Sequence, residues 1–115
     1  MTKRDLSVYI QDIIDSIEKI EEYTTGITED EFMKNSQVHD AVLRRLEIVG
    51  EAVKKVPPSV RGKHPQVPWK KIAGLRDVLI HEYFGVSGKR IWKVVKDDLL
   101  VLKSDMAHIK KGLES

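Results

Sequence analysis

Three side chains that can act on a phosphate group lie within eight residues of one another: Arg76, His81 and Tyr83. Arg76 is charged at any relevant pH, and its guanidinium presents a fork of donors that matches phosphate oxygens. His81 has the side chain best suited to moving protons near neutral pH. Together, Arg76 and His81 could bind a phosphodiester and transfer the protons needed to cleave it without a metal. The sequence therefore predicts a catalytic pair with a phenol beside it.

A helical backbone complicates this pairing. On an ideal helix, residues five apart lie about 140° apart around the axis, so Arg76 and His81 would point to different sides. Two arrangements solve this: the helix unwinds before His81, as Gly85 permits, or two copies of the motif face each other across a dimer, and both can hold together. Structural roles are the alternative. Arg76 would then pair with Glu47 or Glu51, and His81 would bond to free carbonyls at a helix end.

The charge of the chain is distributed unevenly along the sequence. Its net charge is +2, yet the first 50 residues hold six basic and eleven acidic residues, and the rest hold fourteen and seven. No acidic residue lies between Glu51 and Asp77. This acid-free run predicts a surface that attracts phosphate, with Lys70 and Lys71 as binding candidates. A solvated basic loop is the alternative.

Composition sets the class of protein. A chain of 115 residues with 41% hydrophobic and 33% charged residues is typical of one globular domain, residues 1–115. The absence of cysteine excludes disulfides and thiolate zinc sites. His39, His64 and His108 lack metal-ligand spacing, so we expect surface histidines, no metal and no cofactor. No long apolar run indicates a signal peptide or a membrane span, which favours a cytoplasmic protein.

Apolar residues recur at spacings of three and four through most of the chain, which predicts an all-α, up-and-down bundle of four to five helices. The expected helices cover residues 4–23, a short segment from 28 to 33, residues 36–55, a segment that starts at 68–69, and a last segment after Ser87. The apolar set of the 36–55 helix is wider than one stripe. That helix is either central in the bundle or covered on two sides by a partner chain.

The chain resembles a known family, the HepT-like HEPN proteins, which are ribonuclease toxins of prokaryotic toxin–antitoxin modules. The family motif is Arg, four residues, His, any residue, Tyr, and this chain has it at Arg76, His81 and Tyr83. Asp77 stands where a polar residue often follows the Arg. The resemblance covers roughly residues 4–111. It is carried by residues 40–52, 67–77 and 78–86.

The resemblance implies a HEPN-like bundle that dimerises and a metal-independent endoribonuclease that acts on RNA. Within that activity, Arg76 and His81 would be catalytic and Asp77 would support them. The acid-free run, and not the resemblance, adds Lys70 and Lys71 as contacts to the RNA.

The resemblance also implies a partner, a cognate minimal nucleotidyltransferase antitoxin of a type VII-like toxin–antitoxin system. That enzyme would silence the toxin by transferring AMP to Tyr83. A function of another class stays open, a non-catalytic helical subunit that helps a nucleotidyltransferase bind its nucleotide or substrate. Nonspecific DNA binding is weaker, because no predicted helix carries a concentrated basic face.

Overall fold

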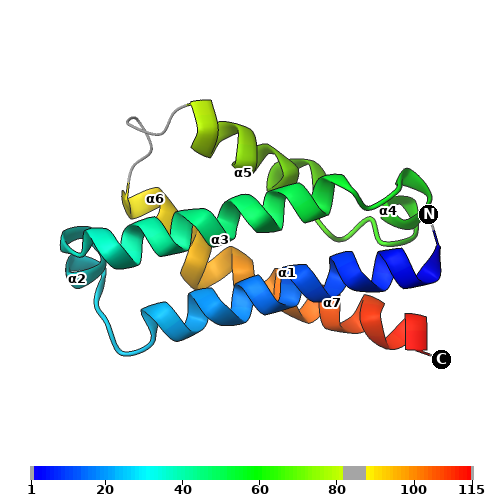
Figure 1. The fold of residues 1–115 in the computed structure, drawn as a ribbon, viewed down its shortest axis with the longest axis horizontal. Helices are drawn as coiled ribbons and strands as arrows, with labels where there is room; N and C mark the ends of the chain where they lie inside the picture. The colour runs from blue at the N-terminus through cyan, green and yellow to red at the C-terminus, as the bar shows by residue number, and fades with distance from the viewer. Residues whose placement is uncertain (1, 82–87, 115) are drawn as a thin grey trace.

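The computed structural model of the chain is an all-α bundle, and it describes residues 2–81 and 88–114, without the side chains of residues 76–81. Two short helices, α2 (Glu29–Lys34) and α4 (Pro58–Lys63), lie in the connections between long ones (Figure 1). The bundle that was expected from the apolar spacing is therefore confirmed. Its long elements are α1 (Lys3–Thr24), α3 (Ser36–Lys54), α5 (Trp69–His81) and a continuous rod made of α6 (Gly88–Lys93), the π-helical segment η1 (Val94–Asp98) and α7 (Leu99–Glu114).

Hydrogen bonds from side chains at the helix starts explain where two helices begin. Thr28 accepts from the Glu31 amide at 3.1 Å, and the Glu31 carboxylate accepts from the Thr28 amide at 3.1 Å. Thr2 and Asp5 form the same reciprocal cap at α1, and the bonds from Thr2 hold the pKa of Asp5 below its usual value. Such caps satisfy amides that the first helical turn leaves unpaired. Gly26, with φ of 79°, makes the turn between α1 and α2.

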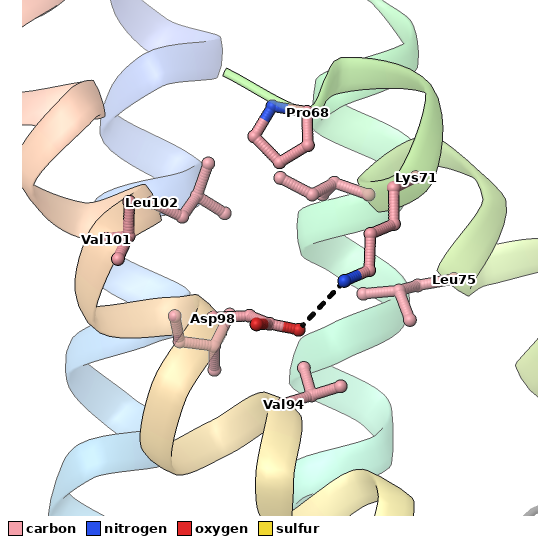
Figure 2. Close-up of a pocket in the computed structure, with 9 residues that line it drawn as sticks. Pro68, Lys71, Leu75, Val94, Asp98, Val101 and Leu102 are labelled. Atoms are coloured by element: carbon pink, nitrogen blue, oxygen red, sulfur yellow. Dashed lines mark hydrogen bonds and ion pairs between the residues drawn. The ribbon is translucent and has the colours of Figure 1, made fainter. Parts of the chain in front are cut away.

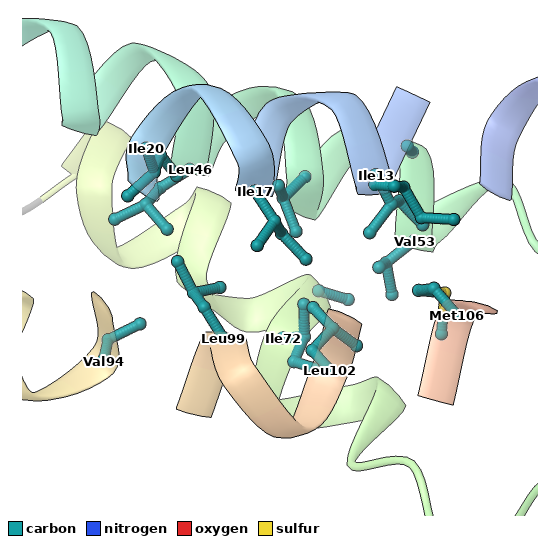
Figure 3. Packing of buried hydrophobic residues seen from close by; sticks show 14 of the residues in the cluster. Ile13, Ile17, Ile20, Leu46, Val53, Ile72, Val94, Leu99, Leu102 and Met106 are labelled. Carbon is teal, nitrogen blue, oxygen red and sulfur yellow. The ribbon is translucent and has the colours of Figure 1, made fainter. Parts of the chain in front are cut away.

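The core is one cluster of apolar side chains, most of them aliphatic, in which every long helix takes part (Figure 3). The α1 stripe predicted from the sequence is buried, and Ile13, Ile17 and Ile20 are fully inaccessible to solvent. Leu46 of α3 lies beside Ile20, and Leu102 of α7 lies across the core from the α1 stripe. Burial of this apolar surface is the main source of the bundle's stability.

Helix α3 lies between α1 and α5 and packs along both (Figure 1). Of the two explanations for its wide apolar face, the central position is confirmed. A second chain is not needed to cover that face, so dimerisation has to be argued from the site instead.

The last rod contains a feature that the sequence did not predict. In η1 the amide of Leu99 donates to the carbonyl of Val94, five residues back, where an α-helix would use a spacing of four. The apolar spacing of the segment is compatible with an uninterrupted α-helix, so the sequence does not indicate the wider turn. The π-helical segment faces α5 across the hollow described below.

Candidate functional site

The predicted motif lies in the C-terminal half of α5 and in the segment that follows it. Helix α5 continues through His81, so the backbone of Arg76, Asp77 and His81 is helical. The arrangement in which the helix unwinds before His81 is therefore wrong. The side chains of these three residues, and the whole of Tyr83, lie outside the described residues.

The register of α5 puts the two catalytic candidates on different sides of the helix. Trp69 and Ile72 are buried against the rest of the bundle, with 7% and 6% of their surface exposed. Arg76 follows them by seven and four residues, so its position continues this buried stripe. The position of His81 lies about 140° further around the axis and about 7.5 Å along it. One chain with an intact α5 therefore does not bring the two positions to one side.

The opposite side of α5 lines a basic hollow that we call the α5–α6 groove. Its volume is about 440 Å³. Lys70 and Lys71 are exposed on its α5 wall, so the structure brings together the two lysines predicted to bind RNA. Its lining residues are Lys70, Lys71, Gly74 and Leu75 from α5, Arg90 and Lys93 from α6, and Val94 and Asp98 from η1.

Arg90 and Lys93 are cations that the sequence reasoning missed. They stand three residues apart on α6, about one turn, and both reach the groove. A spacing of three among the basic residues after Gly88 was the signal available in the sequence. Nothing in the sequence indicated that α6 would face α5.

An ion pair crosses the groove near its apolar end. Lys71 Nζ lies 3.5 Å from Asp98 Oδ2 (Figure 2). The two side chains are 66% and 41% exposed, so the pair adds little to stability and can exchange for another anion. Beyond it, the apolar side chains of Leu75 and Val101 line the adjoining pocket.

The acid-free run does not form a single basic surface. Arg61 donates to the carbonyls of Val53 and Val56 at 2.8 and 2.9 Å, so it caps the end of α3. Lys63 lines a separate hollow beside α7. Among the cations of the run whose side chains are described, Lys70 and Lys71 line the groove.

The remaining histidines have structural surroundings. His39 packs against the Phe32 ring with centroids 5.3 Å apart, and the carbonyl of His64 accepts from the Trp69 indole at 2.9 Å. Both are half-buried, so the expected surface position is correct only for His108. Among the described side chains, no three acids or histidines are grouped as metal ligands. Within the same ranges, no helix is long and apolar enough to span a membrane.

Comparisons with known proteins cover nearly the whole chain. The family model described as HepT-like, Ribonuclease HepT-like, matches residues 13–109. A protein of Thermococcus cleftensis named "Probable ribonuclease HepT" is 42% identical over 109 residues, which are 95% of this chain and 99% of that protein. A "Putative RNase" of Methanocaldococcus jannaschii is 40% identical over 114 residues, 99% of this chain and 98% of that one.

A longer protein of the same archaeon matches as well. It is named "Gamma-glutamylcyclotransferase and putative RNase" and is 45% identical over 112 residues, which are 97% of this chain and 50% of that protein. No solved structure matches the chain.

Proposed function

The chain belongs to the HepT-like ribonuclease family, and on this premise we propose that it is a metal-independent endoribonuclease. The observation that carries the proposal is the family match over residues 13–109, which spans Arg76 and His81. Both residue types suit phosphodiester cleavage. The groove on the His81 side of α5, with four cations around one carboxylate, suits a polyanionic substrate.

The proposed reaction is a transesterification within the RNA strand. His81 removes the proton of a 2′-hydroxyl as that oxygen bonds to the adjacent phosphorus. The bond from phosphorus to the 5′-oxygen breaks, and a histidine returns a proton to that leaving oxygen. Arg76 stabilises the negative charge that builds on the phosphoryl oxygens, while Asp77 supports the Arg. The products are a 2′,3′-cyclic phosphate end and a 5′-hydroxyl end.

We further propose that the active form is a homodimer whose sites are composite. With α5 intact, Arg76 and His81 occupy different sides of one chain. A two-fold axis between two α5 helices would bring Arg76 of one copy toward His81 of the other, and the reverse. A cation at the position of Arg76, which continues the buried stripe, needs a partner, a ligand or a second subunit.

As a toxin, this ribonuclease would need a silencing partner. We propose a cognate minimal nucleotidyltransferase that transfers AMP from ATP to the Tyr83 hydroxyl, with pyrophosphate as the leaving group. The added phosphodiester charge and the nucleoside would oppose RNA binding by electrostatic repulsion and by bulk. The alternative, a non-catalytic subunit of the nucleotidyltransferase, predicts no growth arrest when the chain is expressed without that enzyme.

The function is tested by incubating purified protein with RNA beside the variants Arg76→Ala and His81→Ala. We expect cleavage by the wild type and a loss of roughly 10²–10⁴-fold in His81→Ala, the usual effect of removing one proton transfer. Equal cleavage by the wild type and both variants would assign the activity to a contaminant and refute the proposal.

A further inference from the structure

The α5–α6 groove has cations on both walls, and those on the α6 wall have no role in the chemistry above. We propose that this groove holds the backbone of single-stranded RNA and that Arg90 and Lys93 bind its phosphates opposite Lys70 and Lys71. The inference rests on the proposed ribonuclease function and adds the route by which the strand reaches the site.

Helix packing explains why an open groove exists here. Helix α5 packs chiefly on α3, whereas the α6–η1–α7 rod packs on α1 and α2. The two walls therefore belong to elements held by different neighbours, and a hollow of about 440 Å³ remains between them. The π-helical segment η1 begins directly after Lys93 and ends at Asp98. Such segments occur often at functional sites.

The charge of the groove favours an anion with several phosphates. Among its described lining residues, four are cations and Asp98 is the one acid. Asp98 already lies against Lys71 at 3.5 Å, in an exposed pair that water and salt weaken. An RNA phosphate can replace Asp98 at Lys71. In the free protein, Asp98 then acts as a competitor of the substrate.

The basic surface continues past the groove along α6. Arg90 and Lys93 also border a second hollow, which Lys89, Lys96 and Trp92 line together with the acids Glu29 and Asp97. Four cations therefore face two carboxylates there. Lys96 Nζ lies 4.7 Å from the centre of the half-buried Trp92 ring. Cations that follow one another along a surface are typical of proteins that bind single strands, because they track the phosphate backbone. The Trp92 ring itself already packs against Phe32, with centroids 5.2 Å apart, so the cations carry this argument.

At its other end the groove leads toward the proposed catalytic position. The α5 positions that line it include Gly74, and His81 follows Gly74 by seven residues, close to two helical turns. His81 therefore continues the groove side of α5, and Arg76 does not. A strand lying in the groove would run along α5 toward the histidine that is proposed to act on it.

The test measures binding of a fluorescently labelled single-stranded RNA by anisotropy at several KCl concentrations, in the His81→Ala background so that the RNA stays intact. Each phosphate contact contributes about 0.7 to the slope of log affinity against log salt. Arg90→Gln with Lys93→Gln should flatten this slope by about 1.4 for two lost contacts. The matched control, Lys110→Gln with Lys111→Gln, removes the same charge near the far end of α7 and should leave the slope unchanged.

A second variant should strengthen binding, a result that misfolding cannot produce. Asp98→Asn should bind about threefold tighter at low salt, the effect expected of one unit charge about 6 Å from a phosphate in solvent. An unchanged slope in the Arg90/Lys93 variant, or weaker binding by Asp98→Asn, would overturn the proposed track.

Kinetics separate a failed groove from a failed function. With His81 intact, the Arg90/Lys93 variant should raise KM and leave kcat nearly unchanged. If that variant cleaves RNA with the wild-type KM, the groove proposal is refuted and the ribonuclease stands. If the wild type does not cleave RNA, the proposed function fails on its own, whatever the binding slopes are.

Discussion

The proposed composite site predicts how mixed dimers behave, and this prediction follows from the helical backbone of α5. Because α5 is intact through His81, each site should take Arg76 from one copy and His81 from the other. A dimer built from one Arg76→Ala chain and one His81→Ala chain then contains one complete site and one site that lacks both residues. We expect about half of the wild-type activity per dimer, because one of two equivalent sites is intact.

The reciprocal dimer has the opposite expected result. A wild-type chain paired with a chain that carries both substitutions gives two sites, each lacking one residue. Composite sites predict an activity near the level of the single variants, roughly 10²–10⁴-fold below the wild type. If each site instead took both residues from one chain, this dimer would keep half of the activity and the first dimer would lose it.

Both mixed dimers can be made by co-expressing two differently tagged chains and purifying the pair over both tags in turn. Initial rates are then measured with one labelled RNA at equal dimer concentration, beside the two homodimeric variants. Half activity in the wild-type/double-variant dimer would refute the composite site. So would a wild-type protein whose mass by light scattering is that of a single 13.2 kDa chain while it cleaves RNA.

Three further predictions concern binding, regulation and stability. Changing Lys70 and Lys71 together to Gln should reduce the slope of log RNA affinity against log salt concentration by about 1.4, without changing the product ends. An unchanged slope would mean that both lysines are solvated and do not contact RNA. Tyr83→Phe should keep ribonuclease activity and resist silencing by the nucleotidyltransferase, and mass spectrometry of the co-expressed wild-type pair should find AMP on Tyr83; an unmodified Tyr83 in a silenced pair would contradict this. Leu46→Ala should lower the free energy of unfolding by about 2–5 kcal/mol, because the side chain is fully buried. Both variants are measured by urea titration. The control Leu100→Ala, at a residue 58% exposed, should change the free energy of unfolding by less than about 0.5 kcal/mol.

Much of the fold could be predicted because its signals are local. The spacing of Ile13, Ile17 and Ile20 defines the buried face of α1 without reference to any other helix. The Thr28 cap is likewise complete within four residues of sequence. Local signals of this kind act through one helical turn, so they can be read before the tertiary structure is known.

The site could be predicted only in part, since the groove beside the motif depends on tertiary packing. The spacing of Arg76 and His81 is visible in the sequence, and so is the conflict between that spacing and a helix. The groove is not visible there, because Arg90 faces Lys70 only after α5 and α6 have packed on different neighbours. For the same reason, the acid-free run does not form the single basic surface that its charges predict. Arg61, for example, donates to carbonyls at the end of α3 and caps that helix.

The central claim is that the Arg and His side chains of this chain cleave RNA without a metal. The most direct measurement is the cleavage of a labelled RNA by purified protein in excess EDTA, with the product ends identified by mass spectrometry. We predict cleavage that is undiminished by the chelator, lost in His81→Ala, and marked by a 2′,3′-cyclic phosphate end. Activity that disappears in EDTA and returns with added Mg²⁺ would contradict the account.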